Sequence, residues 1–145
     1  MTWPEARAEI VRLLSGLSIA EPVPLSLRRV HEYPPESLQE LPCAVMEIAG
    51  RQRLRSPSRR ETVYTARWWI VARDERSAPA GAVLDAFSEA VLDAFDGAVA
   101  LGGKATRVEG PVVEPGSALI WGGQTYPAQR YELRVHLIES AAFAP

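Results

Sequence analysis

Two stretches of the chain repeat apolar residues at the three- and four-residue spacing of an amphipathic helix. The first follows Thr2-Trp3-Pro4-Glu5, in which Thr2 and Glu5 have the spacing of a capping box, and it is expected to end at Gly16. The second opens at Ser77-Ala78-Pro79, with Ser77 as the expected N-cap, and ends at Gly97. The buried stripes comprise Trp3, Ala6, Ile10, Leu13, Leu14 and Leu17 in the first helix, and Val83, Leu84, Phe87, Val91, Leu92 and Phe95 in the second.

Alternation of side chains predicts a long strand from Thr62 to Arg73. One face is wholly apolar and is expected to meet a helix: Tyr64, Ala66, Trp68, Ile70 and Ala72. The other face mixes apolar and charged side chains: Val63, Thr65, Arg67, Trp69, Val71 and Arg73. This second face is too apolar for free solvent and too charged for a closed core, so we expect it to contact another subunit. In the alternative interpretation, the proline-rich crossing from Ser18 to Pro42 covers Trp69 within the same chain.

Shorter patterns predict the remaining strands, which are expected around Ser26 to His31, Cys43 to Ala49, Thr106 to Val113, Ala118 to Trp121 and Tyr126 to Ile138. The last of these follows a Gly122-Gly123 turn and places Arg130, Glu132, Arg134 and His136 on a polar face. The tail from Glu139 to Pro145 has no periodicity and is expected to be loose.

The order of these elements predicts an α+β fold. Helix, strands, helix and strands group into a two-layer sandwich, with an antiparallel or mixed sheet and both helices packed on one face. A chain of 145 residues matches one domain, residues 1–145, with one hydrophobic core.

The charges are unevenly distributed, although 16 basic and 18 acidic residues give a net charge of −2. Five arginines lie in the stretch from Gly50 to Arg60, here named the basic segment, which is expected to be a loop without acidic residues: Arg51, Arg53, Arg55, Arg59 and Arg60. Three interpretations remain open, namely a solvated hairpin tip, a protein contact and a nucleic-acid contact. Phosphate binding would suit the arginines, but no aromatic residue between Arg51 and Arg60 is available to stack on bases.

Four acidic residues, here named the acidic row, follow one side of the second helix: Asp85, Glu89, Asp93 and Asp96. No basic residue lies between Arg76 and Lys104 to pair with them. Like charges four residues apart cost a few tenths of a kcal/mol each (~0.2–0.5 kcal/mol), so a group outside the helix is expected to compensate them.

The sequence contains no motif that predicts catalysis or ligand binding. His31 and His136 lack metal-ligand spacing and are each expected at the surface or an interface. Cys43, the one cysteine, is expected to be buried and inert. We therefore expect a protein that is not an enzyme and has no catalytic residues, no cofactor, no metal and no membrane partner.

The order of elements, the short strand Leu41-Pro42-Cys43-Ala44-Val45-Met46-Glu47-Ile48 and the closing strand with Tyr131-Glu132-Leu133-Arg134-Val135 resemble the tail terminator proteins of long-tailed phages and related gene transfer particles. The resemblance implies a ring, usually of six copies, that sits on the last ring of the tail tube, stops tube growth and joins the tail to the neck. It implies a virion location at the head-proximal end of the tail, after assembly in the host cytoplasm. The implied partners are further copies of the chain, the tail tube protein and a neck or connector protein, with DNA only passing through the lumen.

Two alternatives to this function stay open, a head-to-tail connector or neck protein of the same particle and, from another class, a small nucleic-acid-binding module that uses the basic segment. For the ring, we hypothesise that the basic segment reaches the tube or a neighbouring copy, where the acidic row is one candidate target, and that Arg67, Trp69 and Arg73 form a further contact. A competing hypothesis places the acidic row in the lumen, where it would repel passing DNA.

Overall fold

The computed structural model describes residues 2–54, 60–75, 77–98, 100–115 and 117–139. Its helices are α1 (Trp3–Ser15), α2 (Ala80–Asp96) and the short α3 (Ala100–Gly103). Its strands are β1 (Ser18–Ile19), β2 (Leu25–Ser26), β3 (Arg29–His31), β4 (Cys43–Met46), β5 (Gly50–Leu54), β6 (Arg60–Val71), β7 (Arg107–Val113), β8 (Ser117–Trp121) and β9 (Gln124–Glu139).

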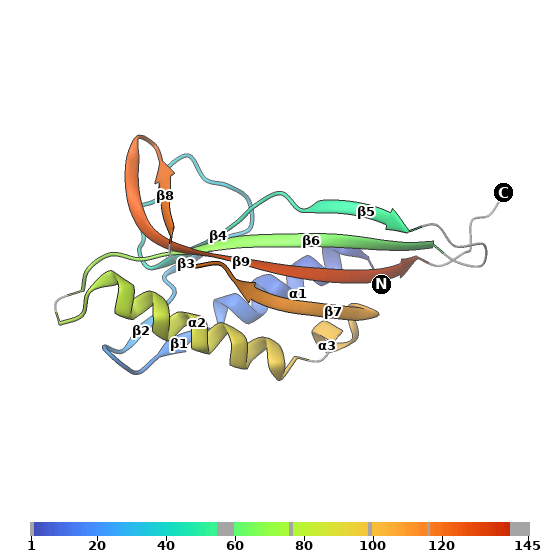
Figure 1. The fold of residues 1–145 in the computed structure, drawn as a ribbon, viewed down its shortest axis with the longest axis horizontal. Coiled ribbons are helices and arrows are strands. Elements are labelled where there is room, and N and C mark those ends of the chain that lie inside the picture. The colour runs from blue at the N-terminus through green and yellow to red at the C-terminus, as the bar shows by residue number, and fades with distance from the viewer. Residues whose placement is uncertain (1, 55–59, 76, 99, 116, 140–145) are drawn as a thin grey trace.

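The long strands β6 and β9 form the centre of the main sheet and pair antiparallel from Arg60 opposite Glu139 to Val71 opposite Ala128 (Figure 1). On the outer side of β6, β5 pairs with its first half and β4 with its second half. On the outer side of β9, β8 pairs with its first part and β7 with its second part. Because β3 runs parallel to β4, the sheet is mixed.

Both long helices lie on one face of this sheet, as the sequence pattern predicts (Figure 1). Ile10 and Leu14 of α1 and Phe87 and Val91 of α2 are fully buried against the apolar face of β6 and β9. At the centre of this core, the Trp68 ring stacks between Phe95 and Tyr131, with ring centroids 5.4 and 5.6 Å apart. The α+β two-layer sandwich is therefore confirmed.

The N-terminal cap of α1 is the predicted one, whereas that of α2 is not. Thr2 Oγ1 accepts a hydrogen bond from the Glu5 amide at 3.3 Å, so α1 has its predicted cap. The prediction of Ser77 as the cap of α2 is wrong, because the N-cap position is Pro79. The carboxylate of Asp74 instead accepts from the Ala80 amide at 2.9 Å, since reciprocal backbone bonds between Glu75 and Ala78 fold the chain back.

The second face of β6 is partly covered by the same chain. A smaller hydrophobic cluster there comprises Leu38, Leu41, Cys43, Val45, Val71, Leu119 and Ala128, with Trp69, Trp121 and Tyr126 packed against it. Trp121 Nε1 donates to the Pro35 carbonyl at 3.0 Å and ties the β8–β9 hairpin to the crossing. Trp69 is thus partly buried against residues of the crossing, and the expected subunit contact of this face stays a prediction.

Three predicted boundaries change in the structure. The basic segment is not simply a loop, because Gly50–Leu54 pairs with β6 as strand β5, and the strand expected around Ser26 to His31 is divided into β2 and β3. The closing strand continues to Glu139, and residues 140–145 of the expected loose tail lie outside the described residues. Gly122 and Gly123, with φ of 57° and 80°, form the predicted hairpin turn, which needs left-handed backbone at both positions.

Candidate functional site

The described arginines of the basic segment project from the helix side of the sheet. Arg51 lies opposite Tyr64 and Arg53 opposite Thr62, so their side chains share the face on which Trp3 stacks over Tyr64. Together with Thr62 and Tyr64 they line a shallow hollow of about 390 Å³. Arg60 follows the same alternation on β6 and is exposed, whereas Arg55 and Arg59 lie outside the described residues.

The acidic row lies along the exposed side of α2, where Asp85, Glu89, Asp93 and Asp96 are all exposed. No ion pair joins any of the four to another described residue. The last turn of α2 contains no basic residue. Because the C-terminal end of a helix carries a partial negative charge, carboxylates there are repelled, and Asp93 and Asp96 increase the need for an external cation.

Arg67 and Arg73, expected at a subunit contact, have partners within the chain. Arg67 forms a cross-strand ion pair of 2.7 Å with Glu132, the residue directly opposite it on β9. Arg73 lies 3.6 Å from Glu75. Their charges are therefore balanced inside the sheet and the following turn, and their expected place at a subunit contact stays a prediction.

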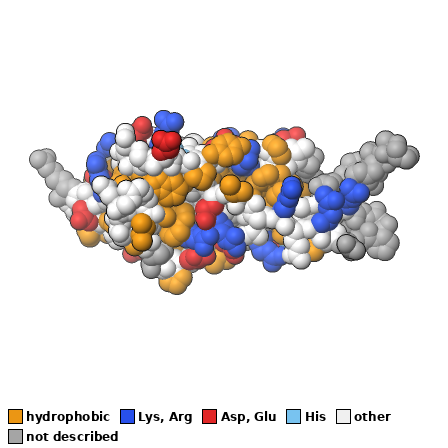
Figure 2. Space-filling model, turned by 90° about the horizontal axis from the view of Figure 1, so that it is seen from above, with side chains coloured by type: hydrophobic (Ala, Val, Ile, Leu, Met, Phe, Trp, Pro, Cys, Tyr) orange, Lys and Arg blue, Asp and Glu red, His pale blue; other side chains and the backbone are white. Residues whose placement is uncertain are grey.

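The face of the sheet away from the two long helices, here named the open face, carries further ion pairs beside an apolar groove. Arg130 pairs with Glu47 at 2.9 Å, and its guanidinium lies 5.6 Å from the centroid of the Trp69 ring. Beside this pair the face is hollowed by about 470 Å³, with lining side chains that include Val45, Ile48, Trp69, Leu119, Ile120 and Trp121. Figure 2 looks onto the molecule from this side and shows hydrophobic side chains gathered over the half that carries β4 and β8. Trp69 is therefore one wall of an apolar groove.

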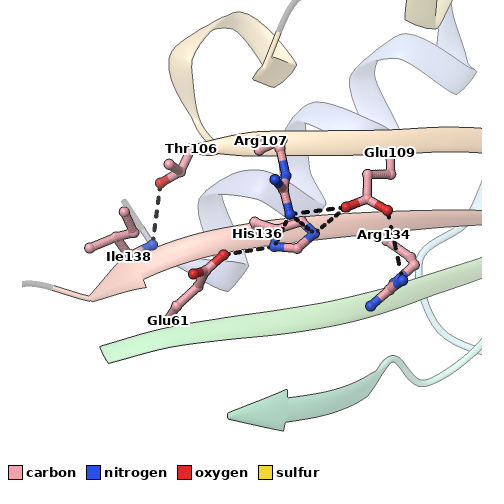
Figure 3. A network of polar contacts seen from close by, with 7 residues as sticks. All are labelled: Glu61, Thr106, Arg107, Glu109, Arg134, His136 and Ile138. Atoms are coloured by element: carbon pink, nitrogen blue, oxygen red, sulfur yellow. Dashed lines mark hydrogen bonds and ion pairs between the residues drawn. The ribbon is translucent and has the colours of Figure 1, made fainter. Parts of the chain in front are cut away.

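His136 is the polar residue that sequence reasoning placed wrongly, because it is 2% exposed and not at a surface. Its Nδ1 lies 2.8 Å from a carboxylate oxygen of Glu61 and its Nε2 lies 2.8 Å from one of Glu109 (Figure 3). Only the doubly protonated imidazolium donates to both carboxylates at once. Arg107 Nη2 lies 3.4 and 3.5 Å from the ring nitrogens and 3.1 Å from Glu109, and Arg134 adds a contact of 3.7 Å with Glu109.

The geometry of this cluster favours a role in stabilising the fold and argues against a metal site. The two carboxylates approach opposite sides of the imidazole, so a single metal ion cannot be bound by all three side chains. Across the part of the chain that the structure describes, no group of three or more His, Cys, Asp and Glu side chains is placed to hold a metal ion. No signal in the sequence predicted the cluster, because β6, β7 and β9 each contribute to it and only their register brings Glu61, Glu109 and His136 together.

Burial also shifts the pKa of three further groups, Cys43, Tyr131 and His31. Burial raises the pKa of the Cys43 thiol to about 11, as expected for an inert core cysteine. Burial, with a smaller effect of the Asp85 charge, also raises the pKa of Tyr131, and burial lowers the pKa of His31. No helix among the described residues is long and apolar enough to cross a membrane.

The described residues thus present three surfaces for function: the basic segment, the acidic row and the apolar groove. Comparison with known proteins does not assign a role to any of them. No family model matches the chain, and no curated protein matches its sequence.

Proposed function

We propose that the protein is a structural virion component, a tail terminator that forms a closed ring on the end of a tail tube. Such a ring stops tube polymerisation and joins the tail to the neck, with a surface toward each partner. The chain then acts through its surfaces, without catalysis, at the head-proximal end of the tail. Its partners are further copies of itself, the tube protein and a neck protein, while DNA passes through the lumen.

One observation carries this proposal: surfaces of opposite charge lie toward opposite edges of the same sheet. β5, with Arg51 and Arg53, forms an edge beside β6, whereas α2 packs under β9 and β7 on the other side. The helix that carries the acidic row therefore lies away from β5 of its own chain (Figure 1). A contact between the two surfaces must then join different molecules.

A contact of this kind is heterologous, because each copy uses two different patches. Repetition of a heterologous contact gives a ring where the rotation closes and a filament where it does not. Opposite charges on the two patches also orient the approaching copies, since the alternative arrangements place like charges together. Salt is expected to weaken the contact, because screening acts within about 8 Å at physiological ionic strength.

Charge exchange between the two surfaces tests the proposal. The purified chain is expected to form a ring whose mass, measured by analytical ultracentrifugation and native mass spectrometry, is a fixed multiple of one chain. Arg51→Glu with Arg53→Glu is expected to abolish the ring, as is Glu89→Arg with Asp93→Arg. An equimolar mixture of the two double variants is expected to form it again, because each supplies the opposite charge to the other's altered surface at alternate contacts.

The control substitution is Arg28→Glu, which changes an exposed arginine outside both surfaces and is expected to leave the ring intact. Rings must also bind the end of assembled tail tubes and stop their growth in a tube polymerisation assay. A chain that remains a monomer at every salt concentration, alone and with tube protein, would contradict the proposal. Tight DNA binding that is lost steeply with salt and with Arg51→Glu would favour the nucleic-acid module instead.

A further inference from the structure

None of the described residues covers the apolar groove on the open face. Ile48 and Ile120, which line it, remain 84% and 73% exposed, although both are large aliphatic side chains. Burial of such a side chain is favourable, because it removes apolar surface from water. A contiguous exposed apolar patch of this kind marks a binding surface, because single exposed side chains are common but hollowed groups of them are not.

The chain itself contains a segment with matching chemistry. Residues 140–145 have the sequence Ser-Ala-Ala-Phe-Ala-Pro, which has no charged side chain and one large apolar residue, Phe143. Small neighbours on both sides allow the backbone beside Phe143 to approach an apolar wall closely. One chain thus contains an exposed apolar groove and an uncharged segment with one large apolar residue.

The register of the sheet excludes a contact between them within one molecule. Trp69 lies opposite Arg130, and Arg60 lies opposite Glu139, at the other end of the β6–β9 pair. The nine residues from Arg130 to Glu139 span about 30 Å of strand. The four residues from Glu139 to Phe143 reach about 14 Å even when fully extended. Phe143 therefore falls short of the groove of its own chain by about half of the distance.

We infer that residues 140–145 of one copy dock in the apolar groove of the next copy, with Phe143 packed between Ile48 and Ile120. This inference rests on the proposed ring, because it requires copies side by side. It adds a second heterologous contact, from the strand end of one copy to the groove of its neighbour. Unlike the charge contact, this one is apolar and is expected to resist salt.

Cysteine crosslinking between two variants tests the inference. Chains with Phe143→Cys and chains with Ile120→Cys are mixed in equal amounts, assembled and oxidised. A disulfide dimer of one chain of each kind is expected on a non-reducing gel, and a reductant is expected to dissolve it. Cys43 does not interfere, since it is fully buried and its raised pKa keeps the thiol protonated.

The matched control replaces Ile120→Cys with Val112→Cys. Val112 is also an exposed apolar residue, at 57%, but it lies on β7 outside the groove. At least tenfold less crosslinked dimer is expected with this partner. Equal yields at both positions would overturn the inference, because they would indicate random collision.

A binding measurement gives an independent result. The chain shortened after Glu139 is titrated with a synthetic peptide of residues 139–145 while tryptophan fluorescence is followed, since Trp69 and Trp121 line the groove. Saturable binding is expected, at least tenfold weaker for the peptide with Phe143→Ala. If rings form but neither the crosslink nor peptide binding occurs, the inference fails and the proposed function stands. If the chain never assembles, both fail.

Discussion

The buried imidazole of His136 is expected to stabilise the fold, and replacement with leucine measures by how much. Leucine keeps much of the side-chain volume but removes two ring nitrogens, each 2.8 Å from a carboxylate oxygen. Hydrogen bonds to charged groups contribute about 1.5–3 kcal/mol each. Loss of one partner of a buried ion pair costs about 3–5 kcal/mol, because the remaining charge stays buried.

The structure places the expected loss at the low end of these ranges. The Glu109 side chain is 43% exposed and keeps Arg107 at 3.1 Å and Arg134 at 3.7 Å, so water and two guanidinium groups replace most of what it loses. Glu61 is 20% exposed and loses a short bond. We therefore expect His136→Leu to lower the free energy of unfolding by about 2–3 kcal/mol, which corresponds to about 5–10 °C in melting temperature.

Urea unfolding followed by circular dichroism measures this change, provided that the slope against urea stays constant. The matched control is His31→Leu, the same substitution at the other histidine, which is only partly buried and is expected to change stability by less than about 0.5 kcal/mol. A cycle with Glu61→Gln is expected to give a coupling of about 1–2 kcal/mol between Glu61 and His136. If His136→Leu proves no more costly than His31→Leu, the cluster does not stabilise the protein as argued.

Two further predictions follow from the described residues. Cys43 is expected to react with a thiol reagent at pH 8 only after urea is added. Its pKa is raised from 9.0 to about 11, so the unfolded chain releases this proton first and stability is expected to fall as the pH rises from about 9 to 11. The fall is expected to be smaller in Cys43→Ala, in which the raised pKa of buried Tyr131 still contributes above about pH 10. Gly110→Ala is expected to lower the melting temperature, because φ is +105° and an added Cβ would lie 3.0 Å from the Glu132 carbonyl oxygen. The same substitution at Gly81, inside α2 with nothing within 4 Å of the added atom, is expected to stabilise by up to about 1 kcal/mol, and equal effects of the two would contradict the argument.

The sequence predicted those elements whose side chains alternate between water and the core. The stripe through Phe87 and Val91 and the apolar face through Trp68 and Ile70 both meet in one cluster, as expected. Strand β5 was missed because all its residues are exposed, so no alternation of polarity marks it, and only the pairing with β6 makes it a strand. The same limit applies to the candidate surfaces, since the acidic row follows from helical spacing alone, whereas the groove depends on three strands and a crossing meeting in space.

The charges of this protein fall into two groups with different physical consequences. On the open face, acids and bases alternate across neighbouring strands, so pairs such as Arg67–Glu132 and Arg130–Glu47 balance within one molecule. The acidic row is instead of one sign and makes no ion pair with another described residue, so its carboxylates repel one another in the isolated chain. Added salt relieves that repulsion in the monomer but would also weaken the attraction between copies in the proposed ring. Salt is therefore expected to stabilise α2 in the monomer and to weaken the proposed charge contact between copies. At high ionic strength, the proposed contact at the apolar groove is then expected to hold neighbouring copies together.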